Sequence, residues 1–333
     1  MLTFGLVGAG RWADVHRRAL EAEGAKLAGV LVASESSRER VERDWGVKAT
    51  VDEGEFWAWQ GDAVIVASPN YLHAPHAIAA LEAGKHVLVE KPMATSLEDC
   101  ERMIAAAQGA GKTLAVGLEM RVFTLFSEVK AILGAGRIGR PLHLKLDLWR
   151  RPYRAGAGGW KDDPKKLGSA ILEEPIHYLD LARWYLGEPV SLQAWANSRP
   201  GQDRLRENLD VRLEFPGGAQ ALVTRSIAAY GHAVNLKLVG ETGALEARWQ
   251  GEMDLDLEPK VSLTLHTGEG TRSVTVPQHT GHAYDVPRQT GAFMQAVIKG
   301  TEPPAAASDG RASVALCLAV EASLASAFKQ QLL

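Results

Sequence analysis

The stretch from Gly5 to Ala13, "GLVGAGRWA", joins a short apolar run to a helical pattern and decides how the first part of the chain folds. Gly8 permits a tight turn, Gly10 lets the backbone approach a pyrophosphate, and Ala13 keeps the following helix close to a sheet. The start of that helix offers N–H groups and a positive dipole end to phosphates. The residues expected to bind a dinucleotide here are Gly8, Ala9, Gly10, Arg11, Trp12 and Ala13. The alternative is a tight turn that binds no ligand.

Short apolar runs and helical patterns alternate on either side of this turn. Strands are predicted at Leu2–Val7, Leu27–Ala33, Ala63–Ala67, Val87–Val89 and Leu114–Leu118. Helices are predicted at Arg11–Glu23, Arg38–Trp45, His73–Ala83 and Glu98–Ala110, the first with Trp12, Val15, Ala19 and Ala22 at helical spacing. This alternation is typical of a parallel sheet covered on both faces. It places the glycine turn first in a doubly wound βα series, which favours dinucleotide binding.

The residues after the second strand normally select the cofactor. An acidic residue there binds the ribose 2′-hydroxyl, whereas a neutral residue with an arginine nearby admits a 2′-phosphate. Here Ala33 and Ser34 are neutral, and Arg38 and Arg40 follow. The segment therefore favours NADP over NAD, with Glu35 close enough to act in the opposite sense. For both arginines, the alternative is a solvated helix face.

Two further turns lie at the carboxyl ends of strands, where open α/β sheets bind ligands. Ser68, Pro69 and Asn70 follow the strand predicted at Ala63–Ala67, and Asn70 or His73 is a candidate cap for the next helix. All four are also candidate cofactor-binding residues.

The stretch "VLVEKPMATS" carries a strand directly into Glu90, Lys91 and Pro92. A lysine at this edge can bond the oxygen of a reacting alcohol or carbonyl, and partial burial would suit it to proton transfer. Glu90 can pair with Lys91 or face the backbone. We expect both residues beside the cofactor, with Lys91 also catalytic and in contact with the substrate. The alternative is a lysine on a surface turn.

The second part of the chain has a different texture. Strands with period-two alternation are predicted at Leu142–Trp149, Val190–Ala196, Asp210–Phe215, Gln220–Ser226, Val234–Val239, Leu245–Trp249, Val261–His266 and Arg272–Val276. Helices are predicted at Phe126–Leu133, Ile176–Leu186, Arg288–Lys299 and Gly310–Lys329. The fold class is thus α/β: an NAD(P)-binding Rossmann domain over residues 1–118, then an α/β domain over 119–333 with a large, mostly antiparallel, open-faced sheet. The second domain is expected to bind substrate and to form a homodimer or homotetramer through its uncovered face.

These motifs together resemble the glucose-fructose oxidoreductase / inositol dehydrogenase / MocA family over essentially the whole chain. The resemblance rests on the glycine turn, Ser68-Pro69-Asn70 with His73, and Glu90-Lys91-Pro92, and it continues through "GRIGRP", Gly159-Trp160 and "LGSAILEEPIHYLDLARWYLG". It implies NAD(P)-linked oxidation or reduction of sugars, polyols or their relatives. It also implies that the lysine is catalytic and that the Lys-Pro peptide is often cis.

The family's second catalytic segment has an Asp, three residues and a His. His177 falls on that histidine, and Glu173 stands where the Asp would be. The resemblance makes His177 the partner of Lys91 in acid/base chemistry, taking the hydroxyl proton as hydride leaves the same carbon. A continuous helix would place Glu173 and His177 on one face. Pro175 is tolerable only in a first helical turn, so Glu173 sits alternatively at the helix entrance, as an orienter, a substrate ligand or a proton relay.

Other substrate-binding candidates are Arg121, where the family often has a polar pocket residue, and Trp160 with Lys161, which can stack on and bond a sugar. Weaker candidates are Tyr153, Asp180, His282 and Tyr284. For each, the alternative is an ordinary packing or loop residue. No metal site is predicted.

Composition limits the remaining possibilities. The 333 residues are 46% hydrophobic and 23% charged with a net charge of −3, as in an ordinary soluble protein without a basic stripe. We therefore expect no nucleic-acid or membrane partner. The apolar start reads as a strand rather than a signal peptide, and no apolar run is long enough to span a bilayer. Cys100 and Cys317 are expected to be buried thiols in a reducing cytoplasm.

Two other functions remain open from the sequence. One is a non-catalytic NAD(P) or ligand sensor of the same fold, since folds of this kind also serve binding roles. The other is a reductase of a non-sugar carbonyl or imine. Turnover on a panel of sugars distinguishes the first, and the polarity of side chains around Trp160 the second.

Overall fold

The computed structural model describes residues 1–59, 61–151, 157–228, 231–251, 256, 258–277 and 285–326. The chain forms two compact units, and each consists of more than one stretch of sequence. The first unit comprises Met1–Glu119, Ala155–Gly168 and Val286–Val314. The second comprises Met120–Arg154, Ser169–Asp285 and Ala315–Leu333. The predicted boundary near residue 118 therefore leaves out the two later stretches, Ala155–Gly168 and Val286–Val314, that also belong to the first unit.

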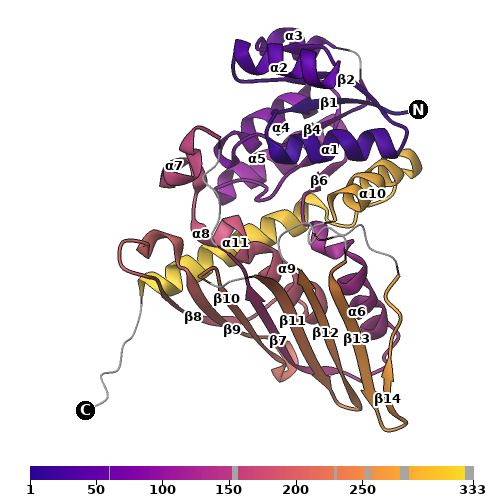
Figure 1. Cartoon of the computed structure of the whole chain (residues 1–333), viewed down its shortest axis with the longest axis vertical. Coiled ribbons are helices and arrows are strands. Elements are labelled where there is room, and N and C mark those ends of the chain that lie inside the picture. Colours follow the sequence, from indigo (N-terminus) through magenta and orange to yellow (C-terminus); the bar gives the residue numbers. More distant parts are fainter. Residues whose placement is uncertain are drawn as a thin grey trace. The chain divides into compact units, whose positions relative to one another are not determined.

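The first unit contains a six-stranded parallel sheet with strand order β3-β2-β1-β4-β5-β6 (Figure 1). Its strands are β1 (Thr3–Val7), β2 (Lys26–Leu31), β3 (Ala49–Thr50), β4 (Ala63–Val66), β5 (His86–Val89) and β6 (Leu114–Val116). This is the doubly wound order, in which the topology reverses between β1 and β4. Ligands of such sheets bind at the carboxyl ends of the strands beside that point.

Helices cover this sheet, and its central strands are buried on both faces. The helices of the unit are α1 (Arg11–Ala22), α2 (Glu35–Trp45), α3 (Glu53–Ala58), α4 (His73–Glu82), α5 (Leu97–Ala110), α7 (Pro164–Leu167) and α10 (Val286–Lys299). Every residue of β4 is buried, which explains why it reads as an unbroken apolar run. Phe293 and Met294 of α10 pack into the same core, so a segment distant in sequence completes it.

The second unit contains an eight-stranded sheet with strand order β14-β13-β12-β11-β7-β10-β9-β8. Its strands are β7 (Pro141–Trp149), β8 (Ser191–Asn197), β9 (Asn208–Glu214), β10 (Gln220–Ser226), β11 (His232–Gly240), β12 (Gly243–Gly251), β13 (Lys260–Thr267) and β14 (Gly270–Ser273). All neighbouring pairs are antiparallel except β7 and β10. The predicted fold class is confirmed.

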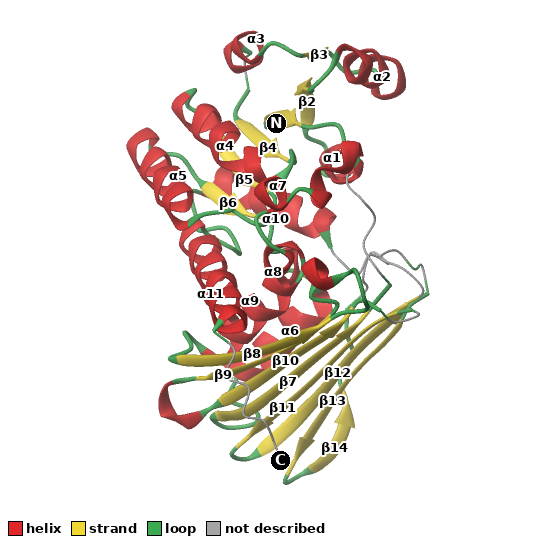
Figure 2. Cartoon of the chain, turned by 90° about the vertical axis from the view of Figure 1, so that its left-hand side faces the viewer, coloured by secondary structure: helices red, strands yellow, loops and turns green. Residues whose placement is uncertain are grey.

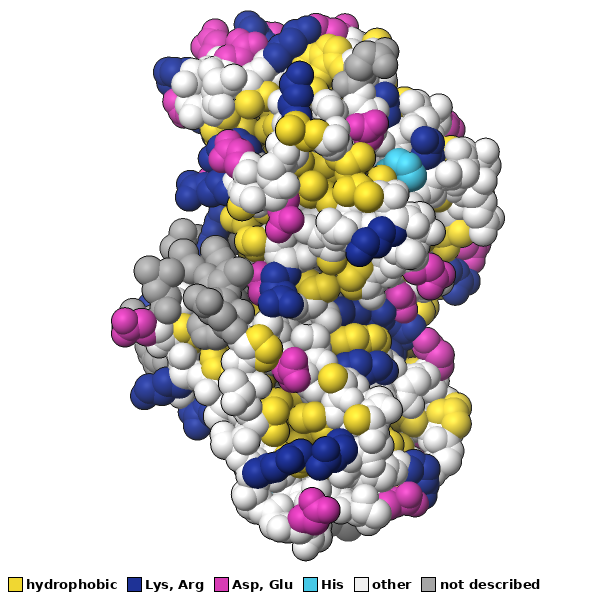
Figure 3. Space-filling view, turned by 90° about the vertical axis from the view of Figure 1, so that its right-hand side faces the viewer, with side chains coloured by type: hydrophobic (Ala, Val, Ile, Leu, Met, Phe, Trp, Pro, Cys, Tyr) yellow, Lys and Arg dark blue, Asp and Glu magenta, His cyan; other side chains and the backbone are white. Residues whose placement is uncertain are grey.

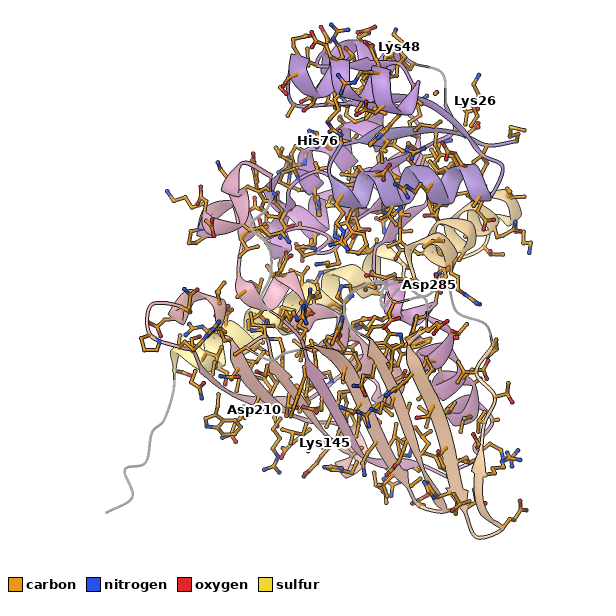
Figure 4. The ribbon with its side chains drawn as sticks, in the orientation of Figure 1. Lys26, Lys48, His76, Lys145, Asp210 and Asp285 are labelled. Carbon is orange, nitrogen blue, oxygen red and sulfur yellow. The ribbon has the colours of Figure 1, made fainter. Side chains whose placement is uncertain are left out.

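One face of the large sheet is covered and the other is open. Helix α6 (Thr124–Gly134) contacts β12, and α9 (Pro175–Leu186) contacts β7 and β10; both helices lie above the strands in Figure 2. Along β7, Leu144, Leu146 and Leu148 are buried, and the alternate residues are exposed or half-buried. Lys145 and Asp210 extend from the open face (Figure 4). The remaining helices are α8 (Ala170–Glu173) and α11 (Ala307–Ala325), which has residues in both units.

Several predicted boundaries and one predicted helix face were wrong. Helix α2 begins at Glu35 rather than Arg38 because the Ser34 hydroxyl accepts the Ser37 N–H and caps the helix there. The short elements β3, α3, α7 and α8 were not predicted, since two to six residues carry little periodic signal. β14 lies at Gly270–Ser273, ahead of the expected Arg272–Val276. The buried face of α1 is formed by Ala13, His16, Ala19 and Leu20, not by Trp12, Val15 and Ala22.

Candidate active site

The glycine turn fits a bound dinucleotide. Gly8 has φ of +103°, and a Cβ there would lie 2.7 Å from the Ala67 carbonyl oxygen, so only glycine is suitable. At Gly10 an added Cβ would meet none of the described atoms within 4 Å, so packing within the protein does not demand glycine there. That open space adjoins the first turn of α1, where an anion is stabilised by the helix dipole. The buried side chain of Ala13 holds α1 close to the sheet.

Arg11, Trp12 and Arg40 make contacts at the glycine turn. The Arg11 guanidinium lies 5.7 Å from the centre of the Trp12 ring. Arg40 donates from Nη2 to the carbonyl oxygen of Ala9 at 2.7 Å, so α2 is tied directly to the glycine turn. From the sequence, Arg40 was expected only as a positive charge near the cofactor, without this contact to the glycine turn.

The candidate cofactor-selecting residues follow β2. Ser34 is exposed and caps α2. Arg38 forms ion pairs with Glu35 at 2.6 Å and Glu42 at 3.0 Å on the same helix. Arg38, which favours a 2′-phosphate, and Glu35, which acts in the opposite sense, therefore form an ion pair with each other.

The turn after β4 is held by contacts of the buried His73 side chain rather than by capping of α4. Residue Leu72 is the N-cap of α4, so neither Asn70 nor His73 fills that role. His73 lies with Nε2 2.8 Å from the Ser68 carbonyl oxygen and Nδ1 2.6 Å from the Pro92 carbonyl oxygen. It thereby joins the turn after β4, which includes Pro69, to the turn after β5. Burial lowers the pKa of His73, and this outweighs the two carbonyl contacts, which raise it.

Asn70 connects a third segment to this edge of the sheet. Its side-chain amide donates to the carbonyl oxygen of Leu167 at 3.0 Å. Leu167 ends the short helix α7, which follows the 3-10 turn Ala157–Asp162. That turn carries Trp160 and Lys161, both half-buried, with the Lys161 ammonium 5.5 Å from the centre of the Trp160 ring. Both therefore belong to the same unit as the glycine turn.

Glu90, Lys91 and Pro92 follow β5 at the same edge. The Lys91–Pro92 peptide is cis. Oε2 of Glu90 accepts the backbone N–H of Lys91 at 3.2 Å, and Oε1 lies 2.8 Å from Nε2 of His16. The carboxylate thus contacts the Lys91 backbone, and the charge of Lys91 is also among the contributions that lower the pKa of Glu90. Burial alone would raise the pKa of Glu90, but the hydrogen bond and charge interaction with His16 help to hold it below its ordinary value.

Glu173 and His177 lie in the second unit, on either side of a break between two helices. Glu173 is the last residue of α8, and Pro175 is the first of α9. Both side chains are almost completely buried. The helix-entrance alternative for Glu173 is therefore the one observed, and the two residues do not share a continuous helix. Glu174, between them, pairs with Arg150 at 2.7 Å.

Arg121 and Asp180 form a buried pair in the second unit. The guanidinium donates from Nε and Nη2 to the two carboxylate oxygens at 2.7 and 2.8 Å. Asp180 also accepts from Arg183 at 3.1 Å. A bidentate pair of this kind fixes orientation strongly. Asp180 lies one helical turn after His177 on α9, so the pair anchors the helix that carries the candidate catalytic histidine.

The structure thus groups the predicted residues in two sets. Lys91 and every candidate cofactor-binding residue lie in the first unit, together with Trp160 and Lys161, while Arg121, Glu173 and His177 lie in the second. Tyr153, His282 and Tyr284 lie outside the described residues. Two buried polar residues were not predicted from the sequence: His16, which contacts Glu90, and Thr290, which contacts His16. The signal for His16 was its spacing of three from Ala13 and Ala19, on the face that proves to be buried.

The arrangement defines a dinucleotide-binding oxidoreductase of the Rossmann type. Residues 2–118 match the model of an oxidoreductase family with an NAD-binding Rossmann fold, and residues 126–246 match a GFO/IDH/MocA C-terminal domain. The chain belongs to the glucose-fructose oxidoreductase / inositol dehydrogenase / MocA family.

Relatives within the family agree with this assignment. Inositol 2-dehydrogenase of Rhizobium meliloti is 28% identical over 97% of this chain and 96% of its own. Inositol 2-dehydrogenase 2 of Saccharopolyspora erythraea is 33% identical over 73% of this chain and 72% of its own. The crystal structure of aldose-aldose oxidoreductase from Caulobacter crescentus shows the same fold, with a TM-score of 0.83, 22% identity and 98% of each chain covered.

Three observations bear on the other expectations. Cys100 and Cys317 are buried thiols outside any disulfide, and burial raises the pKa of Cys100 to about 12. None of the described helices has both the length and the apolarity needed to cross a membrane. Charges of both signs are scattered over the side of the molecule in Figure 3.

Proposed function

We propose that this protein transfers a hydride between a nicotinamide and a secondary hydroxyl or keto carbon of a sugar, sugar derivative or polyol. The observation that carries the proposal is the position of Lys91. It follows β5 at the carboxyl edge of the parallel sheet, and its backbone is held by the buried Glu90 carboxylate. The glycine turn lies in the same unit and fits a dinucleotide. The two inositol dehydrogenases similar to this chain support a polyol or sugar as substrate.

Lys91 and His177 are proposed to divide the proton chemistry. The Lys91 ammonium would keep its proton and donate a hydrogen bond to the substrate oxygen in both directions, stabilising the negative charge that develops there. His177, nearly inaccessible in the first turn of α9, would take or return the hydroxyl proton. When bound, the nicotinamide supplies the hydride acceptor or donor. Positioned proton transfer of this kind is worth roughly 10²–10⁴ in rate.

Four further substrate contacts are proposed. Trp160 and Lys161 would stack on and bond the hydroxyl-rich face of a sugar, and Glu173 would accept from a substrate hydroxyl. Arg121, whose Nε and Nη2 donate to Asp180, is the last proposed contact.

The cofactor is proposed to be NADP in preference to NAD. Ala33 offers no carboxylate to a ribose 2′-hydroxyl, and Ser34 and Arg38 present a hydroxyl and a cation after β2. The opposing contribution is Glu35, which already pairs with Arg38. Dissociation constants should therefore be lower for NADPH than for NADH, and Glu35→Gln should widen the difference. Tighter binding of NADH by the parent protein would contradict the preference.

The open sheet face and the thiols support two further proposals. Exposed Trp149, Trp195 and Val239 lie on that face among charged side chains, and a homodimer or homotetramer would cover them. Two buried thiols without a disulfide fit a reducing cytoplasm.

The test is a panel of sugars and polyols, with NAD and NADP in parallel, followed by absorbance of the reduced cofactor. The parent protein and Lys91→Ala are compared, with Lys26→Ala as control, because Lys26 is exposed at the opposite end of the sheet strands (Figure 4). We expect turnover on at least one polyol or sugar, a loss of ~10²–10⁴ for Lys91→Ala, and none for Lys26→Ala. Cofactor binding without any turnover would favour the sensor, and near-parent turnover of Lys91→Ala would remove its catalytic role.

A further inference from the structure

A histidine occupies the centre of the buried face of α1. His16 is fully buried, between Ala13 and Ala19, where the amphipathic pattern calls for an apolar side chain. Burying a polar ring costs free energy unless both nitrogens find partners. An alanine or leucine would fill this position without that requirement. The ring must therefore be explained by its contacts.

Both ring nitrogens of His16 are in contact with side chains from distant parts of the first unit. Nε2 lies 2.8 Å from Oε1 of Glu90, and Nδ1 lies 3.1 Å from Oγ1 of Thr290. Thr290 is fully buried on α10, which packs against α1. Because the Glu90 carboxylate accepts, Nε2 carries the proton. Thr290 then fixes the orientation of the ring from its other side.

The Glu90 carboxylate is confined on its remaining sides. Its second oxygen accepts the backbone N–H of Lys91 at 3.2 Å. A Cβ added to Gly117 would lie 3.0 Å from Oε2, so the backbone after β6 lies directly against the carboxylate. The main chain of Glu90 is also tied to β4 through the carbonyl oxygen of Val66 at 2.9 Å. Thr290, His16, Glu90 and the Lys91 backbone thus form one connected line of hydrogen bonds.

We propose that His16 is a positioning residue for Lys91: it holds the Glu90 carboxylate in the orientation that fixes the Lys91 backbone, and Thr290 holds the ring. The inference rests on the proposed function, in which Lys91 acts on the substrate. It goes beyond that function because neither His16 nor Thr290 touches the reacting atoms. A displacement of about 1 Å at a catalytic group is enough to cost ~10²-fold in rate.

The line also sets the charge beside Lys91. The titratable groups that act on Glu90 are His16 from α1, Lys91 itself and His73 from α4. Loss of the His16 hydrogen bond removes one of the contributions that lower the pKa of Glu90, so the carboxylate would be protonated at higher pH. A protonated Glu90 carries no negative charge beside the Lys91 backbone, so activity that needs the ionised carboxylate would be lost at a higher pH on the acid side.

The experiment compares His16→Leu, His16→Gln and Thr290→Val with the parent protein. His16→Leu should lower kcat by ~10–100-fold while the dissociation constant of NADPH changes little, since the misplaced group is Lys91 rather than the glycine turn. His16→Gln, whose amide can still donate to Glu90, should recover most of that loss. The acid limit of the pH range of activity should move to higher pH for His16→Leu, and least for His16→Gln. His86→Gln is the control, because His86 lies at the opposite end of β5, where its Nδ1 accepts the Thr113 N–H.

The outcomes separate this inference from the proposed function. Turnover retained in Lys91→Ala would overturn the proposed function and leave His16 with nothing to position. Turnover lost in Lys91→Ala but unchanged in rate and pH profile in a folded His16→Leu would overturn the inference alone. Where His16→Leu does not fold, His16→Gln and Thr290→Val decide by their pH profiles. A shift in Thr290→Val supports the line of contacts, and parent-like profiles in both variants overturn it.

Discussion

The two sheets of this protein treat their faces in opposite ways. The six-stranded sheet is parallel, and its central strands are buried on both sides. The candidate site residues of this sheet therefore lie at the carboxyl edge of the strands. The eight-stranded sheet is almost entirely antiparallel, with one face against helices and the other exposed. The first arrangement leads Lys91 and the glycine turn to one rim. The second leaves a broad surface that carries charged side chains such as Lys145 and Asp210 together with the exposed Trp149 and Trp195.

This difference explains where polar groups are costly. At the edge of the parallel sheet, His16, His73 and Glu90 are buried and each is hydrogen-bonded. On the open face, pairs such as Lys237 with Glu246, at 2.7 Å, remain mostly exposed to solvent. Exposed ion pairs contribute about 0–1 kcal/mol, whereas an unpaired buried polar group costs about 1–3 kcal/mol. Function and stability are therefore coupled at the first sheet and largely separate at the second.

The largest expected effect is on stability. Ile65→Ala, at a fully buried position of β4, should lower the free energy of unfolding of the first unit by about 2–5 kcal/mol, because a cavity opens where both faces are packed. Lys237→Ala, on the open face, should change it by less than about 0.5 kcal/mol. Chemical denaturation followed by circular dichroism measures both. Similar losses in the two variants would break the comparison.

The second prediction concerns the open face itself. If copies of the chain associate through it, Trp195→Arg should weaken association by at least about 2 kcal/mol, since tryptophan is a frequent anchor of interfaces. Ile298→Arg, at a similarly exposed apolar position of α10 in the first unit, is the matched control. Light scattering at micromolar concentration should give an oligomer for the parent and the control, and a smaller mass for Trp195→Arg. A monomeric parent would show that the face remains uncovered.

The sequence distinguishes the two sheets because burial on both faces and burial on one face leave different patterns of apolar residues. An unbroken apolar run such as Ala63–Val66 signals burial on both faces, and the alternation of Leu142–Trp149 signals burial on one. His16 could not be predicted in the same way. It breaks the local apolar pattern of α1, and its partners are 74 and 274 residues away in the chain. The return of α10 to the first unit was equally invisible, because local patterning shows that a helix is amphipathic but not which core it completes.

The third prediction uses His73, buried where two strand ends of the parallel sheet meet. Burial lowers its pKa in the folded state, so the unfolded chain binds the proton more readily. This contribution to stability is therefore fully present above the unfolded histidine pKa of about 6.5 and is lost as pH falls below it. Unfolding free energies measured from pH 8 to pH 5 should decrease toward acid more steeply for the parent than for His73→Gln. Equal slopes would mean that the ring is not held neutral by burial.

The smallest expected effect concerns Glu173, which stands in the second unit where relatives of this chain are expected to carry Asp. Because α8 ends at Glu173 and α9 begins at Pro175, the carboxylate is not carried on the same helix as His177. This separation favours a substrate ligand over an orienter of the imidazole. Glu173→Gln should then raise KM by ~10-fold, as for a lost charged hydrogen bond, with a smaller loss of kcat.

Glu174 supplies the matched control for this change. It is the neighbouring carboxylate and equally buried, but it pairs with Arg150. Glu174→Gln weakens an ion pair inside the second unit, so it should lower the free energy of unfolding rather than raise KM specifically. Steady-state kinetics of Glu173→Gln and Glu173→Asp decide between the roles. A fall in kcat with KM unchanged would make Glu173 the orienter of His177. Parent values of both constants in both variants would remove Glu173 from the site.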